Sequence, residues 1–344
     1  MKIPLYKTLN DVTDVEAVTR IIKRGMYWAG GSENLDFEKA VAQYVGAKHG
    51  VSFNSGTSAL NALMVTYGLG PGDEVIVPSF TYPPTVDAVR YVGATPVFAD
   101  IEEKQYGLDP VDVKSRITDR TKAIIAVHVY GLPCRISDLS KVAKNNGLLL
   151  IEDAAEALGA EEYGKKLGAF GDASIFSFAG NKIISTGEGG MAVTNSENIR
   201  ERLNVVKQSH SWRMSTILAS LGLSQFTKIE YLIQLRRLRA RYLTKALNQI
   251  EGVTPPVEPR GLRHIYQFYT IKVEDRDGLK QHLEQLGIST KIYFKPIMRG
   301  LPVTDAVAEQ VLTLPLYPGL RVREMEYMVE AIKEYVTDEV SMRL

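Results

Sequence analysis

The chain has 344 residues, of which 45% are hydrophobic and 24% are charged. This length suggests about two domains with a substantial buried core, and the composition excludes a largely disordered chain. The 41 basic residues are balanced by 40 acidic residues, so no global field attracts nucleic acid or an anionic membrane. The single cysteine, Cys134, excludes an internal disulfide framework. Because no secretory leader follows Met1 and no apolar run is long enough to span a membrane, we expect a cytoplasmic protein.

The middle of the chain alternates short apolar runs with amphipathic stretches. This alternation predicts an α/β fold with a mostly parallel sheet. The first four predicted strands lack strict alternation of polar and apolar residues, as expected for strands buried on both faces. The segment Ser58–Tyr67 repeats apolar residues at helical spacing and predicts one of the intervening helices. The predicted strands are Glu74–Pro78, Thr95–Ala99, Ala123–Val129, Leu148–Glu152, Ala173–Ser177 and Met191–Thr194.

A long helical pattern follows from about Ser215 to Ile250, and we expect a break near Gly222. After Pro255 and Pro256 the pattern changes to that of a smaller α+β domain, with a boundary near residues 235–255. The predicted elements of this part are a strand at Tyr266–Val273, a helix at Arg276–Leu286, a strand at Thr290–Phe294 and a helix at Val322–Thr337.

Two other functions receive little support from the sequence. The five histidines are scattered without metal-ligand spacing, so no metal site is expected, although a carboxylate-only magnesium site stays open. The basic cluster Arg236, Arg237, Arg239 and Arg241 has no aromatic stacking platform, and Glu230 interrupts it on one side. We interpret this cluster as the solvated or interface face of an amphipathic helix, so no nucleic-acid partner is expected.

One segment has the features of a phosphate site. From Val51 to Leu60 the chain passes from a short strand through small residues into a helix. Small residues let backbone N–H groups approach an anion, and the helix N-terminus adds its partial positive charge. Simple helix capping by Ser55 or Thr57 explains the same residues equally well when they are taken alone.

Two further segments supply a carboxylate and an amine. Asp153 follows the apolar strand at Leu148–Glu152, where ligands gather in open α/β sheets, although it could equally cap the next helix. Lys182 lies between a strand that ends at Ser177 and a glycine-rich turn that ends at Gly190. One lysine is a weak signal by itself. A phosphate cradle, a carboxylate and an amine able to form a Schiff base are together the groups that pyridoxal phosphate requires.

Ordered motifs extend these three segments over most of the chain. They are Phe37-Glu38 with Tyr44–Gly46, Asn54–Leu60, Gly72–Tyr82, Gly93–Asp100, Val127–Gly131, Ile151–Ala157, Ser177–Gly190, Trp212–Ser215 and Leu312–Leu316. With these motifs, which are spread over about 300 residues, the chain resembles the DegT/DnrJ/StrS family of sugar aminotransferases, fold-type I pyridoxal-phosphate enzymes.

The resemblance implies the fold and the assembly. We expect a pyridoxal-phosphate transferase fold of type I, with a mostly parallel seven-stranded sheet flanked by helices and a smaller α+β C-terminal domain. The large cofactor domain would cover residues 1–240, with an N-terminal arm over residues 1–30, and the small domain residues 241–344. Because sites in this fold type are usually completed across a dimer interface, the resemblance also implies a homodimer.

The resemblance assigns roles to individual residues. Lys182 matches the lysine that forms the Schiff base and then carries a proton between substrate and cofactor. Asp153 matches the carboxylate that pairs with the pyridine nitrogen, and Tyr82 matches the aromatic residue stacked on the ring. Glu156 matches the residue near the phenolic oxygen of the cofactor, where an acid needs a donor or a proton of its own. The phosphate cradle is matched by Gly56, Thr57, Ser58 and Ser177.

Three positions depart from the family pattern. Where the family commonly has an asparagine that reaches the cofactor phosphate of the neighbouring subunit, Ser211 or His210 would have to substitute. Ala179, three residues before the lysine, replaces a histidine or aromatic residue and leaves space on the substrate side. The segment from Pro296 to Thr304, near the entrance for the sugar nucleotide, is shorter than usual.

The function implied is the transfer of an amino group, from L-glutamate, to a nucleotide-linked keto-sugar. Relatives that act on another ketone such as a cyclitol remain an alternative, and so does a regulatory homologue that binds the cofactor without turnover. A dehydratase is disfavoured because histidine replaces the lysine in those relatives, whereas this chain has Lys182. Neither nucleic acid nor a membrane is an expected partner.

Overall fold

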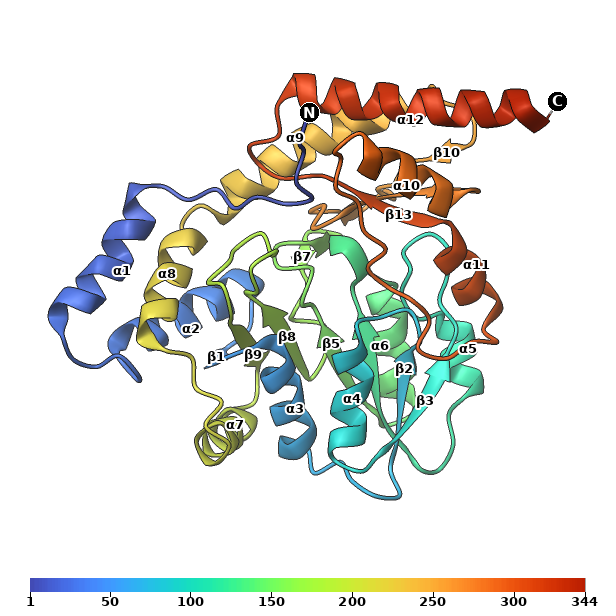
Figure 1. Ribbon diagram of the computed structural model, residues 1–344. Coiled ribbons are helices and arrows are strands. Elements are labelled where there is room, and N and C mark those ends of the chain that lie inside the picture. Colours follow the sequence, from blue (N-terminus) through green and yellow to red (C-terminus); the bar gives the residue numbers. More distant parts are fainter. Residues whose placement is uncertain (344) are drawn as a thin grey trace.

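The computed structural model describes residues 1–343, with side chains up to Thr337. A seven-stranded sheet lies at the centre of the larger part of the molecule (Figure 1). The strand order is β1-β9-β8-β5-β4-β2-β3, and only β9 runs against the other strands, which confirms the predicted mostly parallel sheet. The strands are β1 (His49–Phe53), β2 (Glu74–Pro78), β3 (Thr95–Ala99), β4 (Thr121–Val127), β5 (Leu149–Asp153), β8 (Ala173–Ser177) and β9 (Gly190–Thr194).

Three of the six strands predicted for this sheet have the predicted bounds, and the other three differ by one or two residues. The predicted strand Ala123–Val129 ends at Val127, because the chain turns at Tyr130, which has a φ of 60° inside the 3₁₀ turn η1 (Val129–Gly131). The strand predicted to end at Glu152 continues to Asp153. Asp153 is therefore the last residue of a central strand, at the edge where the carboxyl ends of the parallel strands meet.

Helices cover both faces of this sheet, and successive residues of each strand point to opposite faces. Val75 and Val77 of β2 face one helix layer, whereas Ile76 faces the other. The first layer contains α3 (Gly56–Thr66), α4 (Pro83–Tyr91) and α7 (Glu197–Ser209), and the second contains α2 (Ser32–Val45), α5 (Pro110–Ser115), α6 (Ile136–Asn145) and α8 (Thr216–Phe226).

The helical pattern between Ser215 and Ile250 is divided later than predicted. The break lies at residues 227–228, between α8 and α9 (Ile229–Leu247), and Gly222 lies inside α8. A Cβ at Gly222 would lie 2.8 Å from the Phe37 ring. Glycine is therefore required there for close packing of α8 on α2 and does not end the helix.

The C-terminal part contains a third hydrophobic core beside α9 (Figure 1). The predicted strand at Thr290–Phe294 is wrong: Lys291 forms only an isolated bridge to Thr313, because the rings of Tyr293 and Phe294 pack among other aromatic residues. Two small sheets join distant segments. The remaining elements are β10 (Val253–Thr254), β12 (Tyr269–Val273) and β13 (Val311–Leu314) in one sheet, β6 (Glu161–Glu162), β7 (Lys165–Lys166) and β11 (Leu262–Arg263) in another, and the helices α10 (Arg276–Gln285), α11 (Pro302–Gln310) and α12 (Val322–Arg343).

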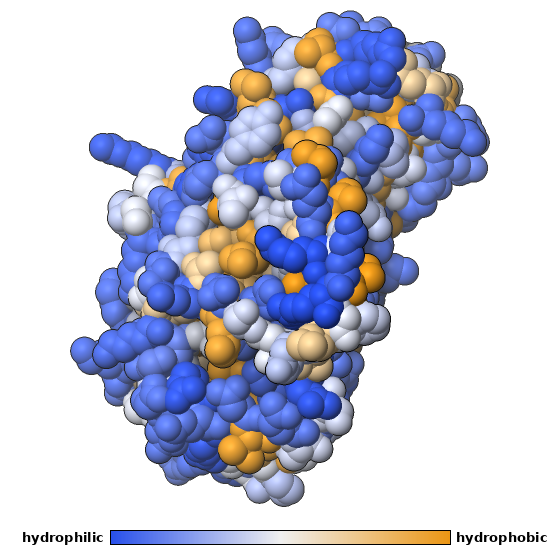
Figure 2. Space-filling view, turned by 90° about the vertical axis from the view of Figure 1, so that its left-hand side faces the viewer, coloured by the Kyte–Doolittle hydropathy of each residue, from blue (hydrophilic) through white to orange (hydrophobic). Residues whose placement is uncertain are grey.

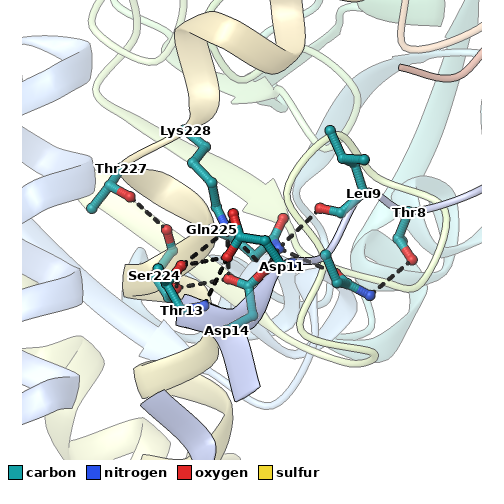
Figure 3. A network of polar contacts seen from close by, with 10 residues as sticks. Thr8, Leu9, Asp11, Thr13, Asp14, Ser224, Gln225, Thr227 and Lys228 are labelled. Carbon is teal, nitrogen blue, oxygen red and sulfur yellow. Dashed lines mark hydrogen bonds and ion pairs between the residues drawn. The ribbon is translucent and has the colours of Figure 1, made fainter. Parts of the chain in front are cut away.

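The N-terminal segment is attached at two places. Ile3 pairs with the C-terminal part, donating to the carbonyl of Gly287 and accepting from the N–H of Ser289. Helix α1 (Val12–Arg24) packs on α8, and its buried Asp14 is the centre of the polar network in Figure 3. The boundary at residue 240, which falls within α9, stays a prediction. No helix of the described residues has the length and apolar character needed to cross a membrane.

Candidate active site

A cavity of about 320 Å³ opens at the carboxyl ends of the parallel strands. Segments far apart in the sequence meet there, including the start of α3, the end of β5 and the loop between β8 and β9. The predicted site residues in its lining are Gly56, Thr57, Tyr82, Asp153, Glu156, Ser177 and Lys182. The position agrees with the rule that ligands bind at this edge of an open α/β sheet.

Lys182 lies on the loop between β8 and β9, and its side chain is largely buried. Its Nζ lies 3.4 Å from Oε1 of Glu156 and 5.8 Å from the ring centroid of Phe268. The side-chain amide of Gln267 holds both neighbours of this lysine: it donates to the Asn181 carbonyl at 2.7 Å and accepts from the Ile183 N–H at 3.0 Å. The amine therefore projects into the cavity from a fixed loop.

Asp153 is a buried carboxylate with two neutral donors. It accepts from the Thr85 hydroxyl at 2.8 Å and from the Ala155 N–H at 3.2 Å. Burial raises the pKa of Asp153, against the opposing effects of these hydrogen bonds and of Lys182. A carboxylate in this condition is stabilised by a ligand that brings a cationic N–H to it.

Glu156 lies beside Lys182 on the cavity wall. Its Oε2 accepts from the Tyr130 N–H at 2.9 Å, and its Oε1 faces the Lys182 amine. Burial raises the pKa of Glu156, while Lys182 lowers it. An acid at this position was expected to need a donor or a proton of its own, and the structure supplies two donors.

The first turn of α3 forms a cradle of small residues. The Ser55 hydroxyl caps the helix by accepting from the Ser58 N–H at 3.0 Å, so the capping interpretation is correct for Ser55. The N–H groups of Gly56 and Thr57 have no partner within the helix and lie at its positive end. A Cβ at Gly56 would lie 3.1 Å from Cβ of Ser177, and one at Gly190 would lie 2.2 Å from the Ser55 carbonyl oxygen. The approach of these segments therefore depends on glycine.

Three predicted positions differ in their relation to the cavity. Tyr82 lines it and is exposed, at the start of α4. Ser58 is not part of the lining, because its N–H and hydroxyl both face the Ser55 hydroxyl. Ser211 lies outside the cavity of its own chain, after α7, with a φ of 56°. The neighbouring His210 stacks on the Trp212 ring at 4.4 Å.

The structure brings to the site several residues that were not predicted from the sequence. The buried His128 lies at the back of the cavity, 3.2 Å from the Glu152 carboxylate. Burial opposes the charge of Glu152, but His128 and the backbone donors Gly168 and Gly171 outweigh burial and lower its pKa. Position 128 falls in the Val127–Gly131 motif, which is the only sequence signal for it. Gln267, Lys291 and Tyr293 lie in the C-terminal part, where no motif indicated a role.

Comparisons with known proteins agree with this geometry. The model of the DegT/DnrJ/EryC1/StrS aminotransferase family matches residues 9–333. GDP-perosamine synthase of Caulobacter vibrioides is 36% identical over 330 residues, covering 87% of this chain and 89% of the relative. The structure of S. venezuelae DesV in complex with a ketimine intermediate has a TM-score of 0.91 at 30% identity, covering 97% of this chain and 98% of that chain. The PLP form of Streptococcus pneumoniae Spr1654 has a TM-score of 0.93 at 25% identity, covering 98% and 99%.

Proposed function

This chain belongs to the DegT/DnrJ/EryC1/StrS family of aminotransferases, and from that premise we propose that it aminates a nucleotide-linked keto-sugar. The amino donor is L-glutamate, and the cofactor is pyridoxal phosphate. Similarity to a GDP-perosamine synthase over most of both chains supports a sugar nucleotide as the acceptor. The observation that carries the proposal is the Lys182 amine, held in one cavity with two buried carboxylates and the open end of α3.

The residues of the cavity fit pyridoxal phosphate. The cradle at Gly56, Thr57 and Ser177 has the small size and the unpaired N–H groups that a phosphate needs. Asp153 is a buried carboxylate with only neutral hydrogen-bond donors, and a protonated ring nitrogen supplies the missing cation. When bound, the cofactor supplies an aldehyde that condenses with amines and a ring that withdraws electrons from the substrate carbon.

In this proposal, each of the following cavity residues has a separate role. The Nζ of Lys182 would hold the cofactor through its aldehyde and would carry a proton to and from the substrate carbon. Asp153 keeps the ring nitrogen protonated, and Thr85 holds that carboxylate in place. Glu156 orients the Lys182 amine and would lie on the side of the cofactor's phenolic oxygen. Tyr82 would cover the ring and limit the access of water.

We further propose that the enzyme is a homodimer. The N-terminal segment exposes several large hydrophobic side chains, and Figure 2 shows the side of the molecule that carries α1 and α8, with hydrophobic groups set among hydrophilic ones. Ser211, outside the cavity of its own chain, is available to complete the site of a partner. A mass in solution equal to one chain, 38.2 kDa, would contradict the dimer. The large hydrophobic side chains exposed on the N-terminal segment are Val12, Val15, Ile22, Met26, Tyr27 and Trp28.

The cytoplasmic location expected from the sequence stays a prediction.

Replacement of the lysine tests the proposed function. The purified protein is expected to be yellow, and its visible absorbance band should disappear when L-glutamate is added. The variant Lys182→Ala should lose turnover of keto-sugar nucleotides by a factor of about 1,000 or more, because the amine and the proton carrier are both removed. Lys165→Ala, a change to an exposed lysine of β7, is the control. Full turnover by Lys182→Ala would contradict the proposal.

A further inference from the structure

Both substrates of the proposed reaction, on which this inference rests, carry anionic oxygens. An amino-acid donor has carboxylates, and a sugar nucleotide has a diphosphate. The net charge of +1 provides no global attraction for such molecules, so local cations have to bind them. Lys182 and Lys291 are the two lysines in the cavity lining, and no arginine of the described residues joins them.

The amine of Lys182 already has an ion-pair partner and a proposed role within the site. Its Nζ faces Glu156 at 3.4 Å, and its amine is the group assigned to the cofactor. Lys291 differs from Lys182 in this respect, because none of the carboxylates that the structure describes lies within ion-pair distance of it. Lys272, on the nearby strand β12, shows the contrast, because its Nζ lies 3.0 Å from Glu103. The charge of Lys291 is therefore available to a ligand.

Lys291 has a fixed place in the cavity wall. Its N–H donates to the Thr313 carbonyl at 3.1 Å, and its own carbonyl accepts from the Thr313 N–H at 2.9 Å. The Nζ lies 4.6 Å from the ring centroid of Tyr293, a distance at which the ring face attracts a cation. Lys291 is exposed to solvent, and the contact with the Tyr293 ring holds its amine beside the cavity lining, where a ligand entering from solvent can reach it.

The aromatic rings of Tyr293 and Phe268 connect Lys291 with Lys182. Tyr293 stacks on Phe268 with 3.8 Å between ring centroids, and the Phe268 ring lies 5.8 Å from the Nζ of Lys182. Asn181, next to the catalytic lysine, donates to the Tyr293 hydroxyl at 3.5 Å. An anionic group bound at Lys291 would therefore belong to a molecule whose other end reaches Lys182.

We propose that Lys291 binds the anionic end of the substrate, a carboxylate of the amino donor or the diphosphate of the sugar nucleotide, and so determines which molecules enter the site. The C-terminal part then supplies substrate recognition, while the large sheet holds the cofactor. Lys291 is a binding residue in this proposal and takes no part in the proton transfers at Lys182.

The experiment measures binding to the cofactor-loaded enzyme by calorimetry at low ionic strength. The probes are glutarate, a dicarboxylate without an amine that can react, and GDP, UDP and dTDP. The variants are Lys291→Gln, which removes the charge, and Lys291→Arg, which keeps it. The matched control is Lys295→Gln, an exposed lysine on the same segment that is outside the cavity lining.

We expect Lys291→Gln to bind one probe class about tenfold more weakly, the usual effect of losing a charged hydrogen bond. Lys291→Arg should stay within about threefold of the wild type, and Lys295→Gln should be unchanged. Loss of glutarate binding alone assigns Lys291 to the amino donor, and loss of nucleotide binding alone assigns it to the diphosphate. Equal binding of every probe by Lys291→Gln and the wild type would overturn the inference. That result would leave the proposed function intact, because the latter is tested by turnover of Lys182→Ala.

Discussion

At the scale of single residues, Asp153 shows how a site is prepared for a ligand at a cost to the fold. Its carboxyl is buried at the end of β5 and receives only the Thr85 hydroxyl and the Ala155 N–H. Because burial raises the pKa of Asp153, its ionisation at neutral pH opposes folding of the cofactor-free protein. The position therefore suits the cationic ligand proposed for it and is unfavourable for stability.

We predict that Asp153→Asn makes the cofactor-free protein more stable at neutral pH. The folded-state pKa of Asp153 lies above the usual 3.8, so the stability of the wild type is lost as the pH rises through that folded value. The advantage of the variant should shrink as the pH falls through the folded value and should disappear below 3.8, where the wild-type carboxyl is protonated in both states. Urea unfolding of both proteins across this range measures the difference.

The affinity for the cofactor should fall in the same variant that gains stability. Asp153→Asn should retain pyridoxal phosphate less well than the wild type, because an amide cannot stabilise a protonated ring nitrogen. Asp87→Asn, a change to an exposed carboxylate of α4 paired with Arg90, should alter neither property. A variant less stable than the wild type at neutral pH would show that a cation already pairs with Asp153.

At the scale of elements, the sequence predicted best what burial determines. The strands β2 and β8 have the predicted bounds, because apolar runs buried on both faces leave a clear pattern. The edge strand β3, which is only partly buried, also has the predicted bounds. The break near Gly222 and the strand at Thr290–Phe294 were wrong, since both depend on partners far away in the sequence. Gly222 is required by the Phe37 ring, and the rings of Tyr293 and Phe294 pack on aromatic residues of other segments.

Helix α1 is fastened to the junction of α8 and α9 by one buried carboxylate (Figure 3). Asp14 pairs with Lys228 at 2.8 Å and accepts from Ser224 at 2.7 Å and from Gln225 at 2.6 Å. Burial opposes the ionisation of Asp14, but these donors outweigh burial and lower its pKa. The stability that it contributes is therefore present above its usual pKa of 3.8 and is lost as the pH falls through the lower folded value.

We predict that Asp14→Asn lowers the free energy of unfolding at neutral pH by about 3 kcal/mol, because Lys228 loses its buried partner. Asp11→Asn is the matched control. Asp11 also pairs with Lys228 at 3.0 Å, but it is more exposed, and asparagine caps a helix as well as aspartate does. The loss of stability for this variant should be much smaller than that for Asp14→Asn. Equal losses for the two variants in urea unfolding would mean that the buried ion pair does not hold α1.

At the scale of the whole molecule, the candidate site depends on contacts between the part of the chain that forms the large sheet and the C-terminal part. Arg236 of α9 was expected on a solvated or interface face, but it is buried, and its Nη1 donates to the carbonyls of Tyr266, Gln267 and Leu316. Burial lowers the pKa of Arg236 to about 10, which leaves it charged at neutral pH. The segment that carries Gln267 is thereby fixed to α9.

The sequence predicted Lys182, Asp153 and the start of α3 as site residues because each follows or precedes a strand in a recognisable motif, and the structure brings them to one cavity. It could not identify Gln267, whose side chain reaches residues more than eighty positions earlier. A buried amide that binds two backbone groups has no periodicity and no fixed spacing from them. Residues of this kind become visible only when the C-terminal part is placed against the sheet.

We predict that Gln267→Leu disturbs Lys182, the proposed catalytic lysine, although Gln267 takes no part in the proposed chemistry. The variant leaves the Ile183 N–H and the Asn181 carbonyl without their partner, at a cost of about 2 kcal/mol in unfolding free energy. Hydrogen exchange at the Ile183 amide should become faster, and kcat should fall more than KM rises, because Lys182 is held less firmly. Gln281→Leu, an exposed change on α10, should leave both measurements as they are. Gln267→Glu separates the two bonds, since a carboxylate can accept from Ile183 but cannot donate to Asn181. If exchange at Ile183 is unchanged in Gln267→Leu while stability falls, Gln267 supports the fold without positioning Lys182.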